Sequence, residues 1–201
     1  MKNEINRIAG RLVKAFNTNT VINPIPVKYC KNINLANKLR KLCEDQIKDE
    51  TIGIKAGGTG IQALKKLKEK EPFTAKVFKK RLVKSGQKVK INQHTKGIEV
   101  EVYYFIKKSF FDFKGKVTKS NVTKFIKFMG PCFEIVGFRQ RNKKFTYLGD
   151  ICGDFGFNIK FVVGRKTKFK KLNLNNLKTS LVSKKNGVKV NGNTNIVYIN
   201  P

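Results

Sequence analysis

The sequence predicts an α+β fold in which a helical N-terminal part precedes a β-rich part. Within about residues 1–50, apolar residues recur at helical spacing. Beyond that point, short runs of β-branched and aromatic residues alternate with glycine, proline and asparagine, which is typical of strands and turns. No linker or change of composition divides the chain. We therefore expect a single domain over residues 1–201, with its β-rich part over about 51–201.

Two amphipathic helices are expected in the N-terminal part. The first covers residues 2–17, where the apolar positions fall on one face: Ile5, Ile8, Ala9, Leu12, Val13 and Phe16. The segment 23–26 contains two prolines and cannot be helical, because each proline pushes the preceding residue into an extended conformation. A second helix follows, with apolar residues from Leu35 to Ile47 on one side and Asn34 as its N-cap.

A lysine within a short strand opens the β-rich part. Residues 51–60 are expected to form a short strand that carries Lys55 and runs into a glycine-rich turn, after which a helix begins near Ile61. The turn lacks the Lys-Ser or Lys-Thr that follows the glycines of a phosphate-binding loop. Lys55 either reaches the surface or is a buried cation that needs an anionic partner, for which a substrate carboxylate or enolate would serve.

Later elements follow the same rules. Residues 149–157 have the composition of a loop with two acidic residues, and residues 177–183 and 188–190 flank Asn186-Gly187, which is typical of a two-residue hairpin turn. Further strands are expected at residues 73–78, 97–106, 133–138 and 159–163.

One more helix is expected before the strand at 133–138. Residues 120–129 place apolar side chains at helical spacing, and Ser120 or Asn121 would cap the N-terminus. Gly130 and Pro131 would end this helix, because proline cannot continue it.

Three glutamates stand in apolar, strand-like surroundings. Glu99 and Glu101 are two residues apart in the strand 97–106, so both side chains point to the same face. Glu134 lies in a second such run. Two carboxylates on one face repel each other unless a cation lies between them, and a divalent cation would satisfy all three. The alternative is a solvated pair of glutamates neutralised by some of the many lysines of the chain.

The charge of the chain is strongly positive. Lys and Arg number 44 against 13 Asp and Glu, which gives a net charge of +31. Such an excess favours nucleic acid as a partner. The lysines are spread along the whole chain, however, and accompany abundant asparagine, isoleucine and phenylalanine, as in proteins from AT-rich genomes. We expect a solvated surface rather than a dedicated nucleic-acid site, although the charge leaves such binding open.

The remaining composition indicates a cytoplasmic, globular protein. Apolar residues make up 40% of the chain, but no run is long enough to cross a membrane, and the charged N-terminus is not followed by the apolar segment of a secretory signal. The cysteines lie far apart and His94 is the single histidine, so reduced thiols are expected rather than a zinc site.

Taken in order, these segments resemble the 2-keto-4-pentenoate hydratase and 4-oxalocrotonate decarboxylase branch of the fumarylacetoacetate hydrolase superfamily. The resemblance covers nearly the whole chain. The residues that carry it are Gly53, Lys55 and Gly57 in a strand and turn; Pro72-Phe73; Glu99 and Glu101; Pro131 to Val136 with Glu134; Arg139; Asp154; Val163-Gly164; and the hairpin at Asn186 leading to Asn200-Pro201.

This resemblance implies a mixed β-sheet roll covered by the N-terminal helices, and a metal-dependent lyase. Glu99, Glu101 and Glu134 would bind Mg²⁺ or Mn²⁺, which acts as a Lewis acid on a small unsaturated 2-oxo acid and stabilises its enolate. Lys55 and Asp154 would be catalytic, and Gly57 and Arg139 would bind substrate. We also expect a homo-oligomer. Hydration, decarboxylation and C–C hydrolysis all stay open.

The chain departs from the family pattern at several positions. Gly137 replaces an acid that often follows the third glutamate, Phe155 replaces an expected asparagine, and lysines follow Pro72 where relatives carry a catalytic aspartate. Relatives also continue past the Asn-Pro element, so we expect the C-terminal part of the fold to be missing and the chain to be a fragment. The alternative function is a non-catalytic, basic descendant that acts as a structural or RNA-contacting subunit.

Overall fold

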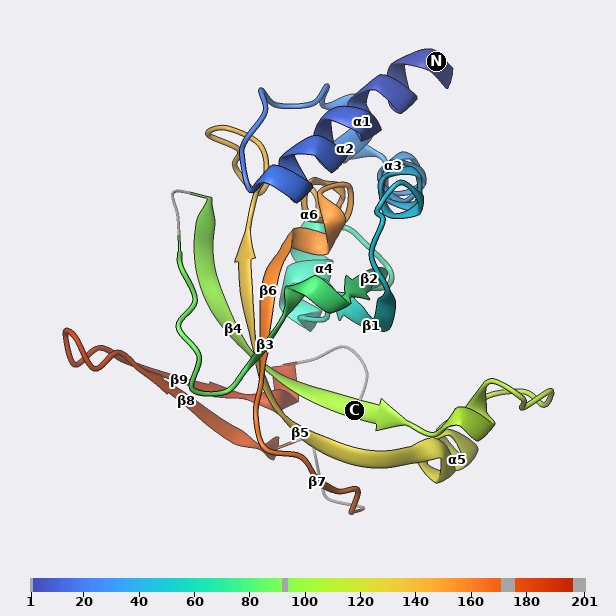
Figure 1. Ribbon diagram of the computed structural model, residues 1–201, viewed down its shortest axis with the longest axis vertical. Helices are drawn as coiled ribbons and strands as arrows, with labels where there is room; N and C mark the ends of the chain where they lie inside the picture. Colours follow the sequence, from blue (N-terminus) through green and yellow to red (C-terminus); the bar gives the residue numbers. More distant parts are fainter. Residues whose placement is uncertain (1, 92–93, 171–175, 197–201) are drawn as a thin grey trace.

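A computed structural model describes residues 2–91, 94–170 and 176–196. The two longest helices lie at one end of the molecule, and a strongly bent sheet extends from there toward two projecting hairpins (Figure 1). The helices are α1 (Lys2–Thr18), α2 (Lys28–Lys31), α3 (Ile33–Asp45), α4 (Ile61–Leu67), α5 (Lys119–Val122) and α6 (Leu148–Cys152). Short 3₁₀ turns include η1 (Lys79–Arg81), η2 (Lys108–Phe110), η3 (Thr123–Phe125), η4 (Phe155–Phe157) and η6 (Thr194–Ile196).

The helix predicted over residues 2–17 is confirmed as α1. The predicted apolar face of α1 packs on α3 in a core that includes Ile8, Leu12, Phe16, Leu39 and Cys43. All four cysteines of the chain are free and buried, as expected for reduced thiols. Among the described residues, no helix combines the length and the apolar character that a membrane span requires.

The cap predicted for the second helix is wrong by two residues. The side chain of Asn32, not Asn34, accepts hydrogen bonds from the backbone N–H groups of Asn34 and Leu35. Asn32 has an extended backbone, which is the conformation of an N-cap, whereas Asn34 already lies inside α3. The helix therefore begins at Ile33.

In the part of the chain that the structure describes, the strands form three sheets. The main sheet is mixed and has the strand order β3-β6-β5-β4, with β7 beside β5. Among the strand pairs of this sheet within the described residues, β3–β6 is parallel and the others are antiparallel. Two antiparallel pairs, β1–β2 and β8–β9, complete the set. The bounds are β1 Thr51–Gly57, β2 Phe73–Phe78, β3 Leu82–Lys84, β4 Thr95–Ile106, β5 Ile126–Gly137, β6 Asn158–Val163, β7 Thr167–Lys168, β8 Lys178–Val182 and β9 Lys189–Asn193.

The helix predicted over residues 120–129 is wrong. Only α5 and the turn η3 are helical, with Thr118 as the cap, and β5 begins at Ile126. Pairing with β4 along the whole of β5 outweighs the local helical spacing. Gly130 and Pro131 therefore lie inside a strand. Pro131 is tolerated because it falls between the ends of β6 and β7, where the strand needs no N–H donor on that side.

Two further local predictions need correction. The segment predicted as a loop contains α6 and η4, because Asp150 accepts hydrogen bonds from the backbone N–H groups of Thr146 and Tyr147 and so caps α6. The hairpin β8–β9 forms as expected, but its connection is longer than two residues. The backbone N–H of Ser183 donates to the Val188 carbonyl, which closes the loop outside Asn186-Gly187. Asn200 and Pro201 lie outside the described residues.

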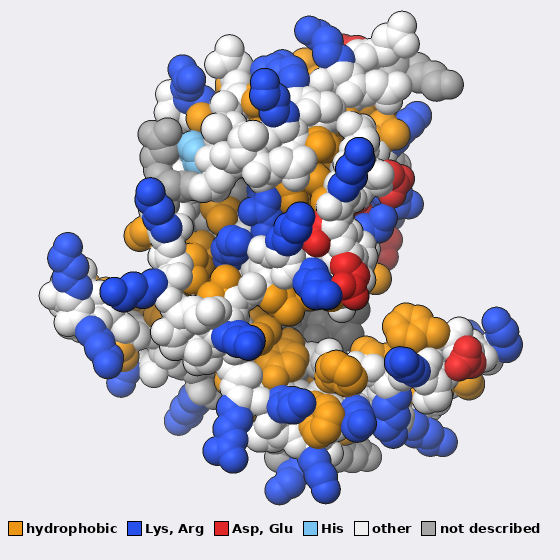
Figure 2. Space-filling view, in the orientation of Figure 1, with side chains coloured by type: hydrophobic (Ala, Val, Ile, Leu, Met, Phe, Trp, Pro, Cys, Tyr) orange, Lys and Arg blue, Asp and Glu red, His pale blue; other side chains and the backbone are white. Residues whose placement is uncertain are grey.

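The face of the molecule seen in Figure 2 is mainly basic. Lysine and arginine side chains are spread over both the helical end and the projecting hairpins, and acidic side chains are few (Figure 2). This distribution agrees with the even spread of charge along the sequence.

Candidate metal centre

The sheet register brings the three predicted glutamates together. Glu99 and Glu101 alternate with Val100 along β4, so both project from one face. Antiparallel pairing sets Glu134 of β5 directly opposite Glu99, and directly opposed residues share a face. One carboxylate oxygen of each glutamate lies within 4.8 Å of the others. Residues from two strands thus form a single carboxylate cluster.

A glycine keeps the two strands in this register. Gly137 ends β5 where β4 begins, and a Cβ atom at this position would lie 1.9 Å from the backbone oxygen of His94. A side chain does not fit there. The replacement of an acid by Gly137 therefore has a packing reason in this chain.

Lys55 is the cation of the cluster. Its Nζ donates to both carboxylate oxygens of Glu134, at 2.5 and 2.7 Å, and to the carbonyl oxygen of Gly156 at 3.1 Å. The side chains of Lys55 and Glu134 are 10% and 2% exposed. The pair joins the β1–β2 sheet to the main sheet, since Lys55 lies in β1 and Glu134 in β5. The anionic partner that the sequence required is thus a glutamate of the protein itself.

One ammonium group does not neutralise three carboxylates. Burial raises the pKa of Glu134 to about 7, and the neighbouring Glu99 and Glu101 add to this shift although Lys55 opposes it. The pKa of Glu101 is also raised, by partial removal from water and by Glu99. Negative charge is therefore costly at this position, and a further cation would lower that cost.

The donor set suits a hard divalent cation. Magnesium prefers oxygen ligands and commonly keeps positions for water or substrate. Glu134 lies at the buried side of the cluster, whereas Glu99 and Glu101 are exposed, so an ion held between them would face solvent on one side. The neighbouring Cys132 is a poor ligand, because burial raises the pKa of its thiol to about 11 and keeps it protonated.

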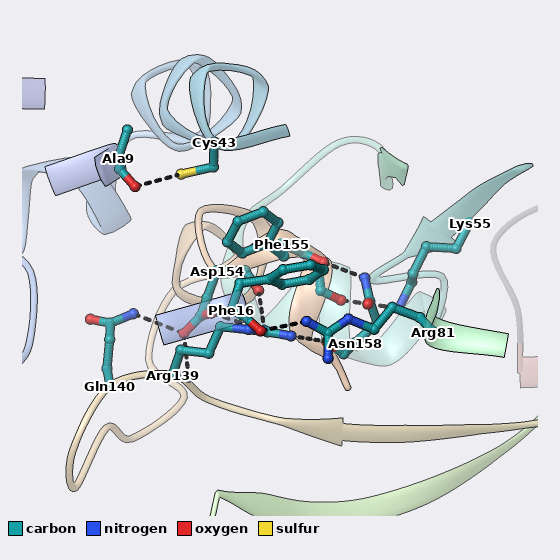
Figure 3. A network of polar contacts seen from close by, with 11 residues as sticks. Ala9, Phe16, Cys43, Lys55, Arg81, Arg139, Gln140, Asp154, Phe155 and Asn158 are labelled. Carbon is teal, nitrogen blue, oxygen red and sulfur yellow. Dashed lines mark hydrogen bonds and ion pairs between the residues drawn. The ribbon is translucent and has the colours of Figure 1, made fainter. Parts of the chain in front are cut away.

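Arg139 and Asp154 form a separate buried pair. The backbone N–H of Arg139 donates to Oδ2 of Asp154 at 2.8 Å, and its Nη1 donates to Oδ1 at 3.1 Å. The guanidinium lies against the rings of Phe16 and Phe155, at 4.8 and 5.2 Å from their centres (Figure 3). Neither side chain belongs to the carboxylate cluster. Their predicted roles, substrate binding for Arg139 and catalysis for Asp154, stay predictions.

The buried pair supports the turn that contacts Lys55. Phe155, Gly156 and Phe157 all have positive φ angles, of 53°, 66° and 71°, which residues other than glycine rarely adopt. Asp154 precedes this turn. After the turn, the backbone carbonyl oxygen of Asn158 accepts a hydrogen bond from the Arg139 guanidinium. The side-chain amide of Asn158 donates to the backbone carbonyl of Phe155. The turn presents the Gly156 carbonyl to Lys55. Sequence reasoning missed this contact, because a backbone oxygen has no residue signature.

Gly57 lies at the end of β1, two residues beyond Lys55. A Cβ atom there would lie 2.4 Å from Cζ of Phe73 on the paired strand β2. Glycine at this position therefore allows the ring of Phe73 to pack against the end of β1. The substrate-binding role expected for Gly57 stays a prediction.

Comparison with known proteins identifies the fold. No protein-family model matches the chain, and no curated protein matches its sequence. Two solved structures of 4-oxalocrotonate decarboxylase from Pseudomonas putida G7 are similar to it at 16% identity, over 98% of this chain and 76% of theirs. The one complexed with magnesium and adipate gives a TM-score of 0.74, and the one complexed with calcium and acetate gives 0.76. The likeness confirms the predicted α+β architecture with a mixed sheet.

Proposed function

We propose that the chain binds a divalent metal ion, Mg²⁺ or Mn²⁺, through Glu99, Glu101 and Glu134, and that it acts as a lyase on a small unsaturated 2-oxo acid. The observation that carries this proposal is the convergence of three carboxylates from two strands beside a buried lysine. The shared fold adds support, since the solved structures of that fold hold a divalent ion together with a small carboxylic acid.

The metal ion, Lys55 and the Gly156 carbonyl would each have a different role in this reaction. When bound, the metal ion would supply a Lewis acid for the carboxylate and carbonyl oxygens of the substrate. Lys55 would hold a proton on Nζ at the edge of the cluster and exchange it with the substrate carbon that gains or loses electron density. The Gly156 carbonyl would keep that ammonium group oriented. Water addition and loss of CO₂ both fit this arrangement, with hydroxypentadienoate and oxalocrotonate as their respective substrates.

A second candidate function follows from the charge. With a net charge of +31, the chain could serve as a basic, non-catalytic subunit of a larger assembly that contacts RNA. Metal binding separates the two functions, because a purely structural subunit has no need of an ion at the carboxylate cluster.

The test measures Mg²⁺ affinity by calorimetry and turnover of 2-hydroxypenta-2,4-dienoate and 4-oxalocrotonate by absorbance. Glu101→Gln removes one charged ligand and should abolish both metal binding and metal-dependent turnover. Glu50→Gln is the matched control, since Glu50 is an exposed carboxylate paired with Lys79 away from the cluster. Unchanged Mg²⁺ affinity in Glu101→Gln would refute the metal site. Normal metal binding without turnover of either acid would refute the reaction class alone.

A further inference from the structure

A basic, aromatic hairpin projects from the far end of the long strands. Strand β4 runs out through Phe105, the chain turns through η2, α5 and η3, and β5 returns from Ile126 (Figure 1). We call residues 105–128 the aromatic arm. Its phenylalanines are Phe105, Phe110, Phe111, Phe113, Phe125 and Phe128.

The rings of the arm pack on one another and not in the main core. Phe125 contacts Phe110 and Phe113, with ring centres 5.4 and 5.1 Å apart. At the base of the arm, Phe105 and Phe128 meet edge to face at 6.1 Å. This scaffold leaves large apolar surfaces in water, since Phe111 is 75% exposed and Phe105 55%. Exposed rings fixed in this way mark an interaction surface more often than isolated apolar residues do.

Lysines surround these rings. Exposed lysines of the arm are Lys107, Lys108, Lys114, Lys116, Lys124 and Lys127. Asp112 is the one acidic residue between positions 105 and 128. The ammonium groups of Lys127 and Lys166 lie 5.4 and 5.0 Å from the centre of the Phe128 ring. In Figure 2 the arm shows exposed apolar side chains flanked by basic ones.

The charge decides which partner fits this surface. A second copy of the chain would bring one lysine-rich arm against another surface of a molecule that carries +31, so charge opposes self-association here. A polyanion is attracted instead. Exposed aromatic rings stack on the faces of unpaired bases, which a duplex keeps covered. Lysines spaced among rings therefore match the alternation of phosphates and bases in a single strand.

We propose that the aromatic arm binds single-stranded nucleic acid, with Phe111 stacking on a base and the surrounding lysines contacting phosphates. This inference does not depend on the metal-dependent function; it rests on the second candidate function and deepens it by placing the nucleic-acid contact on one surface. Binding should weaken with salt, because each neutralised phosphate releases condensed counterions. It should also tolerate changes of sequence, because every base offers a face for stacking.

The test is fluorescence anisotropy of a labelled oligouridylate, titrated with the full chain in EDTA over a series of potassium chloride concentrations. Phe111→Ala should weaken binding about tenfold, as expected when one stacked ring is removed. The substitution leaves the fold intact, because the ring is mostly in water. Phe145→Ala is the matched control, since Phe145 is an exposed phenylalanine outside the arm, and it should bind as the unmodified chain does.

A second pair of variants tests the lysines. Replacing Lys108, Lys114 and Lys116 by glutamine should reduce the slope of log affinity against log salt by about 2, at roughly 0.7 for each phosphate that is no longer neutralised. The same replacement of the exposed Lys65, Lys66 and Lys70, in and after α4, removes equal charge elsewhere and should change the slope far less.

Several outcomes would overturn the proposal. Equal losses of affinity in both triple variants would mean that overall charge, not the arm, holds the strand. Full affinity in Phe111→Ala would exclude stacking. Equal affinity for a duplex of the same length would show that unpaired bases are not recognised. Binding to anionic phosphatidylserine vesicles without binding to the oligouridylate would assign the arm to a membrane surface instead.

Discussion

Replacement of Lys55 by methionine should tighten Mg²⁺ binding while abolishing turnover. Methionine keeps much of the length and apolar character of the side chain but removes the positive charge that pairs with the Glu134 carboxylate. An ion bound to Glu134 would lie about 5 Å from Nζ, taking about 2 Å for a metal–oxygen bond and about 3 Å for the ammonium–oxygen contact. At that separation a single and a double charge repel by about 1.7 kcal/mol in a water-like dielectric and by more where water is excluded. Loss of the ammonium should therefore increase the Mg²⁺ affinity of the ionised cluster by at least about tenfold at alkaline pH. At neutral pH the proton taken up by Glu134 competes with the ion and offsets this gain.

The raised pKa of Glu134 limits the damage that this substitution does to the fold. Removal of one partner of a buried ion pair usually costs about 3–5 kcal/mol, because the other charge is left alone. Glu134 already titrates at about 7 with Lys55 present. Without Lys55 it takes up a proton at neutral pH and no buried charge is left. We expect the metal-free variant to lose only about 1–2 kcal/mol, the range of a single hydrogen bond.

Calorimetric titration of the metal-free protein with MgCl₂ at pH 9, where protons compete weakly for Glu134, measures the affinity, and urea unfolding at pH 7 measures the stability. Lys55→Arg keeps the charge and should bind Mg²⁺ as weakly as the unmodified chain. Lys76→Met removes a half-exposed lysine that pairs with Asp45 and should change neither quantity by much. Weaker or unchanged Mg²⁺ binding in Lys55→Met would refute the idea that Lys55 and the ion compete for Glu134.

Three further outcomes are expected from the same interactions. Glu134 has a higher pKa when folded than unfolded, so the metal-free chain should lose up to about 3 kcal/mol of stability as pH rises from about 4.5 to 7, and Glu134→Gln should flatten this dependence in urea unfolding. Arg139→Gln strands the buried carboxylate of Asp154 and should cost about 3–5 kcal/mol in the same assay. Gly137→Ala forces a Cβ against the His94 carbonyl, so it should cost about 2 kcal/mol or more and weaken Mg²⁺ binding by shifting the strands.

Each of these outcomes has a contrary result. Stability that rises between pH 4.5 and 7 would mean that Glu134 is ionised in the fold throughout. Lys79→Gln breaks an exposed pair and should cost no more than about 1 kcal/mol, so an equal loss of stability in Arg139→Gln would show that the buried pair has no special weight. Normal Mg²⁺ affinity in a destabilised Gly137→Ala variant would show that Mg²⁺ binding does not depend on Gly137 holding the register of β4 against β5.

The carboxylate cluster was predictable in part from local rules. Strand periodicity alone sets Glu99 and Glu101 on one face. Glu134 was added because it stands in a second apolar, strand-like run, and the family resemblance agreed. Its place opposite Glu99 depends on the register of β4 against β5, which no local pattern specifies. For Lys55, local reasoning left open a surface lysine and a buried cation with an anionic partner such as a substrate; the fold buries it and provides Glu134 as that partner.

The errors of local reasoning arise where pairing between distant segments or the backbone conformation decides the structure. Apolar residues between positions 120 and 129 fit a helical stripe, yet the second half of that segment is a strand, because pairing with β4 satisfies its backbone groups. Asp150 was assigned to a loop although it caps α6. The Gly156 carbonyl beside Lys55 could not be found at all, because its position depends on three consecutive residues with positive φ. Long-range pairing and backbone geometry decide these points.

The paired strands β4 and β5, each 12 residues long, govern how this molecule can change by insertion and deletion. One residue added within the middle of β4 would turn every later side chain to the opposite face and separate Glu99 from Glu101. Residues added at the tip, between η2 and α5, would only lengthen the connection and leave the pairing unchanged. The tip is therefore free to diversify in length and composition, whereas the strands that carry the glutamates can vary only by substitution.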